Sequence, residues 1–284
     1  MLKKDVLLKN YTIFKIGGPA KYFFVARTKE NLVSAIKKAR ENNWPCFVLG
    51  GGSNVLVSDK GFKGLVIKIQ NTKYKIQDTE IVAEAGVFLG TLINVATKLS
   101  LTGLEWAAGI PGTLGGAVFG NAGAFGQSMK DIVREVELFD TKVGKIKVFK
   151  NKDCKFSYRE SIFKKNKNLI IISLILKLKK GRKKDVQKKI KKYLAYKKET
   201  QPLSYASAGS VFKNPPGKSA GELIEKAGLK GKTIGGAQIS KKHANFIINK
   251  GKAKAEDVKK LISLVKKTVK KKFGTSLEEE IVVL

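Results

Sequence analysis

Residues 107–129 read AAGIPGTLGGAVFGNAGAFGQSM, with seven glycines between positions 109 and 126. A second glycine-rich stretch, LGGGSNVLVSDKGFKGLVIKI, occupies residues 49–69. Glycine at this density permits positive φ angles and lets the backbone approach a ligand closely. Exposed N–H groups in such turns bind phosphate. We therefore expect a phosphate-binding site that is built from loop backbone in two pieces.

The common nucleotide-binding motifs do not fit these stretches. Residues 50–55, GGGSNV, lack the third glycine of G-x-G-x-x-G, and the residues after them indicate loop and strand. A Rossmann turn must open a helix, because the helix N-terminus holds the pyrophosphate. No G-K-[ST] closes either stretch, which excludes a P-loop. A long ligand with a pyrophosphate in its middle, such as a flavin dinucleotide, would suit two separated loops.

The rest of the chain mixes strand and helix patterns, and this predicts the α+β class. Apolar runs bounded by turn residues predict strands at 22–26, 46–50, 65–69, 80–86, 134–140 and 169–178. Apolar residues at helical spacing predict helices over 28–42, 88–100, 181–198, 219–228 and 255–272. Ser219 and Glu222 form a capping-box pattern, and Gly228 is a stop signal. The charge density rises near residue 180, where we place a domain boundary.

Length and cysteine content indicate a cytoplasmic protein. The 284 residues allow one large domain or two or three smaller ones. Two cysteines, Cys46 and Cys154, cannot form a disulfide framework, so a reducing compartment fits best. The N-terminus shows no apolar signal core, and the most apolar run, 169–178, is too short to span a bilayer.

The formal net charge is +34, which would attract polyanions. Much of this charge belongs to two amphipathic helical segments with lysine on the wet face, around the stripes Val186, Ile190, Leu194 and Val258, Leu261, Ile262, Val265, Val269. A nucleic-acid reader more often carries arginine with interleaved aromatic residues. We therefore expect a solvated lysine surface and no specific nucleic-acid partner. We expect the lone histidine, His243, to be a structural or surface residue.

Six blocks of sequence occur in one order along the chain. They are NYTIFKIGGPA (10–20), VLGGGSNVLVSDKGFKGLVI (48–67), GLEWAAGIPGTLGGAVFGNAGAFG (103–126), FSYRESIFK (156–164), SAGSVFKNP (207–215) and LEEEIVVL (277–284). Together they resemble the UDP-N-acetylenolpyruvoylglucosamine reductase family, flavoenzymes of peptidoglycan precursor synthesis, from about residue 10 to the C-terminus.

This resemblance implies a fold and a domain division. Two FAD-binding α+β subdomains of the PCMH/vanillyl-alcohol-oxidase type would occupy residues 1–68 and 69–180. A smaller α+β substrate-binding domain would occupy residues 181–284. FAD would be bound non-covalently, without a metal, and the protein would be a monomer. By motif position, FAD would be held by Gly50, Gly51, Gly52, Ser53, Asn54, Val55, Leu56, Gly109, Pro111, Gly112, Thr113, Gly115, Gly116, Ala117, Gly120 and Gly123.

The resemblance also implies a reaction and its residues. NADPH would reduce FAD, and reduced FAD would give hydride to the vinyl carbon of UDP-N-acetylglucosamine enolpyruvate, yielding UDP-N-acetylmuramate. Ser210 would donate the proton, Arg159 would stabilise the enolate at its carboxylate end, and a protonated Glu280 would polarise the substrate. The family pattern Glu-x-Glu before a β-branched residue selects Glu280 from the three glutamates. Asn214, four residues after Ser210, is a candidate substrate ligand.

The subtype and some alternatives follow from the same residues. The 51 positions between Arg159 and Ser210 resemble the shorter subtype without a substrate-binding tyrosine loop, so Tyr193, Tyr196 and Tyr205 are not given that role. The lysines of 188–198 are candidates for holding the UDP phosphates. An oxidase on the same scaffold, or a polyanion binder without a chromophore, remains an alternative. A serine hydrolase fits poorly, because no base is found near Ser210.

Overall fold

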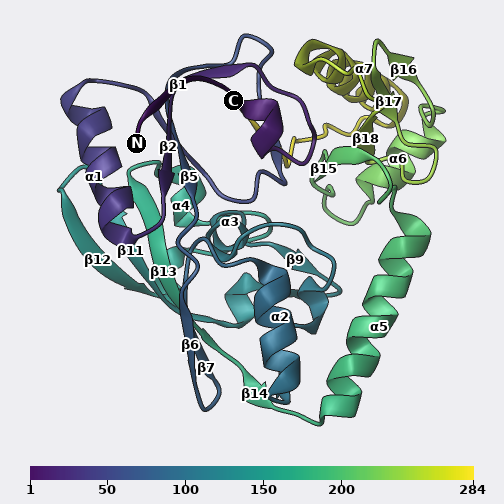
Figure 1. Ribbon diagram of the computed structural model, residues 1–284. Helices are drawn as coiled ribbons and strands as arrows, with labels where there is room; N and C mark the ends of the chain where they lie inside the picture. Colours follow the sequence, from purple (N-terminus) through teal and green to yellow (C-terminus); the bar gives the residue numbers. More distant parts are fainter. The chain divides into compact units, whose positions relative to one another are not determined.

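The computed structural model describes residues 1–284 and confirms the α+β class (Figure 1). The chain forms two compact units, each assembled from three separated segments. Unit 1 contains Met1–Lys3, Phe23–Gly51 and Gly64–Tyr196, and unit 2 contains Lys4–Tyr22, Gly52–Lys63 and Lys197–Leu284. The chain therefore passes between the units within the first glycine-rich stretch, after Gly51.

Unit 1 contains a five-stranded antiparallel sheet with the order β12-β11-β13-β7-β6. Its strands are β6 (Tyr74–Gln77), β7 (Glu80–Glu84), β11 (Val133–Asp140), β12 (Lys145–Lys150) and β13 (Leu169–Lys177). Residues alternate between the two faces, so that Val136 and Leu138 of β11 lie in the core. Helix α3 (Leu114–Phe119) of the second glycine-rich stretch packs against this sheet. A Cβ at Gly115 would lie 2.7 Å from the Ala85 Cβ, so the close packing requires glycine there.

A four-stranded sheet has the order β1-β2-β5-β3, formed by β1 (Lys3–Leu7), β2 (Pro19–Ala26), β5 (Phe62–Ile69) and β3 (Cys46–Leu49). Strands β3 and β5 are parallel. Helix α1 (Lys29–Glu41) lies between β2 and β3 in sequence, and its buried residues include Leu32 and Ile36. The Thr28 hydroxyl accepts a hydrogen bond from the Asn31 amide and caps the first turn. The predicted helix over 28–42 is thereby confirmed.

Unit 2 is built on the antiparallel sheet β15-β18-β17-β16, with α6 and α7 packed together beside it (Figure 1). These elements are β15 (Ala206–Ser210), α6 (Ala220–Lys226), β16 (Thr233–Ile234), β17 (Ala237–Ile239), β18 (Phe246–Asn249) and α7 (Ala255–Phe273). The predicted α7 stripe, from Val258 to Val269, is buried against Ile239 and Ile247 in one apolar cluster. The Ser219 hydroxyl caps α6, and Gly228 with φ +77° follows its end, as predicted.

Helix α5 (Lys183–Thr200) confirms the helix predicted over 181–198 but corrects its apolar stripe. Val186 is 3% exposed, whereas Leu194 is 44% exposed. Helical spacing predicts that Val186 and Leu194 share one face of α5. It does not predict whether other parts of the protein cover that face along the whole helix, and at Leu194 they do not.

The remaining elements are short. They are η1 (Leu8–Tyr11), β4 (Val55–Leu56), α2 (Leu89–Lys98), β8 (Leu101–Thr102), η2 (Glu105–Ala107), β9 (Gly123–Ala124), β10 (Gln127–Ser128), η3 (Met129–Asp131), η4 (Asn151–Cys154), α4 (Ile162–Lys165), β14 (Lys179–Lys180) and β19 (Val282–Val283). None of the helices combines the length and the apolar character that crossing a bilayer requires.

Candidate functional site

Ser210 is the last residue of β15, and a β-bulge comes directly before it. Ser207 pairs with Ile248 and Ser210 pairs with Phe246, so β15 has one more residue than β18 over this interval. Gly209 lies in the bulge with φ +78°, a conformation that glycine adopts without strain. A bulge of this kind bends the strand and redirects the side chain that follows it. The glycine before the serine therefore sets the direction of the Ser210 hydroxyl.

The C-terminal segment of the chain runs beside the residues that follow Ser210. The Glu280 amide donates to the Val211 carbonyl at 2.8 Å, and the Lys213 amide donates to the Glu278 carbonyl at 2.9 Å. Phe212 and Glu279 form an antiparallel bridge between these hydrogen bonds. Ser210 and Glu280, which the sequence separates by 70 positions, are thus joined through one short stretch of backbone in unit 2.

The three consecutive glutamates have different partners. The Glu278 carboxylate pairs with the Lys213 ammonium at 2.6 Å, and the Glu279 carboxylate pairs with Lys266 at 2.9 Å. The half-buried Glu280 is the one whose backbone is tied to Val211. The carboxylates of Glu278 and Glu279 therefore form ion pairs with lysines, while the backbone of Glu280 is joined to the residue that follows Ser210.

Glu280 is also contacted by the first glycine-rich stretch, in addition to Val211. Strand β19 pairs with β4 in parallel, with Val282 opposite Val55. The Asn54 side-chain amide donates to the Glu280 carbonyl at 3.2 Å, and the Val282 amide donates to the Asn54 carbonyl at 2.9 Å. Of the predicted flavin ligands, Asn54 thus also fixes the backbone of a predicted catalytic residue.

In unit 1 the two glycine-rich stretches meet. A Cβ at Gly50 would lie 2.5 Å from the Thr113 Oγ1, and a Cβ at Gly51 would lie 2.7 Å from the Gly112 Cα. Such distances are shorter than non-bonded heavy atoms tolerate, so a side chain at either position would push the two stretches apart. The contact presents loop backbone from both stretches, and this fits a cofactor that is recognised largely through backbone N–H groups.

Arg159 lies in unit 1, in a tight turn that its neighbours close. The Ser157 and Glu160 backbones exchange two hydrogen bonds of 3.1 Å, and Arg159 has φ +57°, which is uncommon for a side chain of this size. Its guanidinium donates to the Gly123 carbonyl at 2.8 Å. The predicted charge-stabilising arginine is therefore in direct contact with the predicted flavin-binding loop.

The predicted site residues are divided between the two units. Unit 2 contains Gly52, Ser53, Asn54, Val55, Leu56, Ser210, Asn214 and Glu280. Unit 1 contains Gly50, Gly51, Gly109, Pro111, Gly112, Thr113, Gly115, Gly116, Ala117, Gly120, Gly123 and Arg159. The Asn214 side chain accepts from the Ala220 amide at 3.0 Å, so it also supports the start of α6.

Two supporting residues were not found from the sequence. The Asn121 side chain, 4% exposed, donates to the Ser157 carbonyl at 2.8 Å and accepts from the Lys130 amide at 3.0 Å. These hydrogen bonds connect the second glycine-rich stretch to the turn that contains Arg159. The ammonium of Lys68 donates to the Gly50 carbonyl, and burial lowers the pKa of this lysine. A lysine inside the apolar run LVIKI was the available signal.

His243 has a structural environment. Its Nδ1 accepts from the Asn245 amide at 3.2 Å, and its ring meets Phe246 edge-on at 4.9 Å. Burial, and then the charge of Lys230, lower the pKa of the imidazole, while Glu225 opposes this effect. The histidine thus supports the turn before β18, in agreement with the role expected for it.

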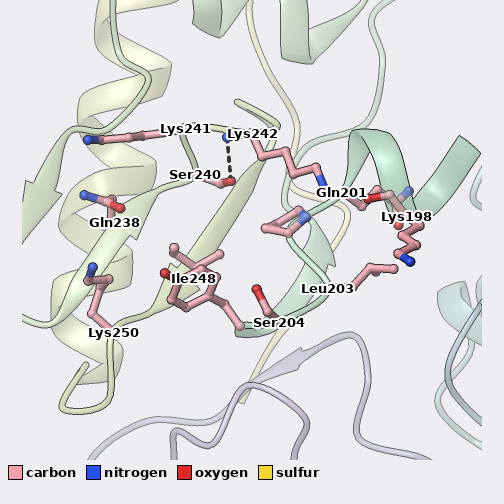
Figure 2. Close-up of a pocket in the computed structure, with 12 residues that line it drawn as sticks. Lys198, Gln201, Leu203, Ser204, Gln238, Ser240, Lys241, Lys242, Ile248 and Lys250 are labelled. Carbon is pink, nitrogen blue, oxygen red and sulfur yellow. Dashed lines mark hydrogen bonds between the residues drawn. The ribbon is translucent and has the colours of Figure 1, made fainter.

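Unit 2 also contains a cavity of about 540 Å³ between the end of α5 and the sheet (Figure 2). Lysine side chains come to it from three elements: Lys198 from α5, Lys241 and Lys242 from the turn after β17, and Lys250 from the end of β18. No carboxylate lines the cavity. The Lys242 ammonium donates to the Lys198 carbonyl at 2.5 Å. The lining therefore contains four lysines and no carboxylate, and it includes neither Ser210 nor Glu280.

Comparison with known proteins gives consistent matches over the whole chain. The FAD binding domain family matches residues 20–150, and the C-terminal domain family of UDP-N-acetylenolpyruvoylglucosamine reductase matches residues 201–284. Proteins named UDP-N-acetylenolpyruvoylglucosamine reductase from Caldanaerobacter subterraneus and Clostridioides difficile are 47% and 42% identical, over 98% and 100% of this chain and 91% and 93% of theirs. The crystal structure of the enzyme from Thermus caldophilus superimposes with a TM-score of 0.86 and 37% identity, over 100% of this chain and 99% of that one.

Proposed function

Because this chain belongs to the UDP-N-acetylenolpyruvoylglucosamine reductase family of flavoproteins, we propose that it reduces the enolpyruvyl ether of UDP-N-acetylglucosamine enolpyruvate with electrons from NADPH. The product would be the lactyl ether, UDP-N-acetylmuramate. This reaction is a cytoplasmic step in the synthesis of peptidoglycan precursors. The observation that carries the proposal is the direct backbone link between the Ser210 strand and the Glu280 segment in unit 2.

The glycine contact in unit 1 fits FAD. The close approach of Gly50 and Gly51 to Gly112 and Thr113 presents backbone from both stretches, and the family match to an FAD binding domain includes all four residues. When bound, FAD supplies the hydride that is added to the vinyl CH₂ carbon. Lys68, whose ammonium donates to the Gly50 carbonyl, would hold the loop and contribute positive charge for the pyrophosphate.

The chain's own residues would handle the negative charge and the proton. Addition of hydride to the CH₂ carbon places an electron pair on the adjacent carbon, where the carboxylate delocalises it. Arg159, fixed by its contact with Gly123, would compensate this charge. The Ser210 hydroxyl would donate its proton to that carbon and complete the new C–H bond, and it would regain a proton from solvent. Glu280 would hydrogen-bond to the substrate beside the same carbon.

A serine hydroxyl is a weak acid, so its position decides whether it can act. The bulge at Gly209 aims the side chain, and the Val211 link sets its spacing from Glu280. General acid catalysis by a positioned group contributes roughly 10² to 10⁴-fold. The enolate carbon is strongly basic, so no histidine is needed in this step.

We also propose that the lysine cavity of unit 2 receives phosphate groups of a substrate. Its cations come from separate elements and are not neutralised by any carboxylate in the lining (Figure 2). An anion with two or more charges would offset the repulsion between these ammonium groups. Lys198 belongs to the group of lysines, 188–198, that the sequence singled out for this role. Unlike Ser210, these residues would affect binding rather than the protonation step.

The domain division and the oligomeric state complete the proposal. We propose that residues 1–68, 69–180 and 181–284 act as two flavin-binding subdomains and a substrate-binding domain, and that the active protein is a monomer. The remaining predicted site residues would act as assigned, with Asn214 as a substrate ligand.

The experiment that tests the reaction is the visible absorption spectrum of the purified protein under anaerobic conditions. The flavin spectrum should bleach on addition of NADPH and return on addition of the enolpyruvyl sugar nucleotide. Ser210→Ala should bleach normally and return slowly, because it removes only the proton donor. A protein that stays colourless after incubation with FAD would overturn the flavoenzyme assignment. Return of colour with oxygen and not with the sugar nucleotide would favour an oxidase.

A further inference from the structure

The side chain of Asn245 continues a strand pairing where the backbone pairing ends. Its amide nitrogen donates to the Phe212 carbonyl at 2.8 Å, and its Oδ1 accepts from the Phe212 amide at 3.0 Å. The Asn245 carbonyl meanwhile accepts from the Val211 amide at 2.8 Å. A residue pair in an antiparallel sheet exchanges the same two bonds through its backbones. The carboxamide therefore acts as an additional peptide group beside Phe212.

These hydrogen bonds hold the stretch that connects Ser210 to Glu280. Val211, Phe212 and Lys213 lie between Asn245 on one side and the 278–280 segment on the other. Without the carboxamide, this stretch would keep its hydrogen bonds to the 278–280 segment. On the β18 side it would keep the bond from the Val211 amide to the Asn245 carbonyl but lose both bonds to Phe212. Asn245 is 4% exposed, so water cannot readily replace the lost bonds.

We propose that Asn245 is a positioning residue for the protonation step, acting through Val211 and Phe212 to set the spacing between the Ser210 hydroxyl and Glu280. This inference rests on the proposed function of Ser210 and Glu280. The carboxamide supplies one donor and one acceptor in fixed geometry, and both are needed to hold the Phe212 peptide. The residue need not touch the substrate or the flavin to have this effect.

The test separates the two half-reactions by anaerobic stopped-flow absorbance. Asn245→Leu removes both side-chain hydrogen bonds, and Asn245→Asp removes the donor while the carboxyl group is ionised. For Asn245→Leu we expect the return of flavin colour with the enolpyruvyl sugar nucleotide to slow by roughly 10²-fold, the effect of a displacement of about 1 Å. Bleaching by NADPH should remain within about twofold of wild type, because that step does not use Ser210.

The pH profile of Asn245→Asp provides a second readout. A protonated carboxyl group presents one donor and one acceptor, as the carboxamide does. The return of colour should therefore accelerate as the pH falls from 8 toward 5.5 (about the range in which a buried carboxyl group can take up a proton). Wild type and Asn245→Leu should not show this recovery, because neither has a carboxyl group at the position. His243, whose Nδ1 accepts from the Asn245 amide, is present in all three proteins, so an effect of its protonation would be common to them.

Asn249, the last residue of β18, offers a matched control, because Asn245 lies directly before the same strand. It is also buried, its amide donates to the Phe14 carbonyl at 3.1 Å, and its Oδ1 accepts from the Gly251 and Ala253 amides. Asn249→Asp should lower the melting temperature but leave the ratio of the two half-reaction rates near that of wild type. If the Asn245 variants behave like Asn249→Asp, the positioning role is wrong. If wild type itself shows no return of colour with the sugar nucleotide, the proposed function fails instead.

Discussion

The side chain of Asn54 donates a hydrogen bond to the carbonyl of Glu280, 226 positions further along the chain. Asn54 belongs to the glycine-rich stretch assigned to FAD, and Glu280 belongs to the C-terminal segment assigned to the substrate. The parallel pairing of β4 with β19 supports this contact, with Val55 opposite Val282. The same loop can therefore serve the cofactor and fix the backbone of a proposed catalytic residue.

Asn54→Ala should lower the free energy of unfolding by about 1 kcal/mol, the typical contribution of one hydrogen bond. It should also slow the return of flavin colour with the sugar nucleotide, because the Glu280 carbonyl loses a fixed donor. Denaturant unfolding and stopped-flow absorbance measure these two effects. Asn42→Ala, which removes a side-chain amide hydrogen bond to the Lys38 carbonyl outside the proposed site, is the control. Equal kinetics in the two variants would show that the Asn54–Glu280 contact does not matter for the reaction.

Gly209→Ala should impair the reaction as well as stability. The Cβ would meet no atom within 4 Å, but the φ of +78° would cost a non-glycine residue roughly 1–2 kcal/mol. Relief of that strain would alter the bulge and redirect Ser210. Gly217→Ala is a matched control, since Gly217 has φ +67° and the same open surroundings. Both variants should melt at a lower temperature, and only Gly209→Ala should slow the return of flavin colour.

Gly51→Ala should weaken FAD binding. The added Cβ would lie 2.7 Å from the Gly112 Cα, so the two glycine-rich stretches would have to separate. Flavin content after purification and the Kd of the apoprotein for FAD measure this effect. Gly90→Ala in α2 is the control, because its Cβ would meet no atom within 4 Å. That variant should retain FAD and gain up to about 1 kcal/mol in helix stability. A yellow Gly51→Ala protein with wild-type affinity would contradict the assigned flavin site.

Reversing two charges in the lysine cavity should weaken substrate binding. The double variant Lys241→Glu, Lys242→Glu should raise the KM of the sugar nucleotide or of NADPH by at least about tenfold, with kcat changed less. The increase should shrink as salt is added, because salt screens the interaction in wild type. Lys267→Glu, Lys271→Glu on α7 makes the same change in net charge away from the cavity. An equal rise in KM for both double variants would assign the effect to net charge alone.

Lys197 should make the stability of the protein depend on pH in the alkaline range. It is 5% exposed, and burial lowers the pKa of its ammonium from 10.5 to about 8. Between these values the unfolded chain binds the proton and the folded protein does not, so the free energy of unfolding rises with pH. The full difference corresponds to roughly 3 kcal/mol. Urea unfolding at pH 7.5 and 10 should show the rise in wild type and in the exposed control Lys198→Met, and a flatter response in Lys197→Met.

The motifs allowed the family and the cofactor to be predicted, because these depend on short segments, and the comparisons confirm both. The roles of the site residues stay predictions. The spacing of Val258, Leu261 and Val265 predicted α7 and its buried face, and the structure confirms both. The same reasoning was wrong about the burial of Leu194 on α5. Local periodicity describes one helix, whereas burial also depends on what packs against it.

The supporting residues could not be predicted in the same way. Asn245 and Lys68 lie outside the quoted motifs, and Asn121 lies within one but was given no role. Each acts through a hydrogen bond to a backbone group distant in sequence. A side-chain amide in an apolar strand pattern could equally have been an edge or turn residue. The role of such a side-chain amide depends on which backbone group lies opposite it. That partner is fixed only by the pairing of the strands in the folded protein.

The sequence by itself determined the family and the flavin cofactor. Glycine spacing, the serine after Gly209, Arg159 and the terminal glutamates are local features, and local features can be read along one chain. Only the tertiary structure decided that the loop of Asn54 fastens Glu280, that Val211 links Glu280 to the Ser210 strand, and that Asn245 completes the pairing. These contacts join residues from 33 to 226 positions apart, and they form because buried backbone groups must find partners when the core closes.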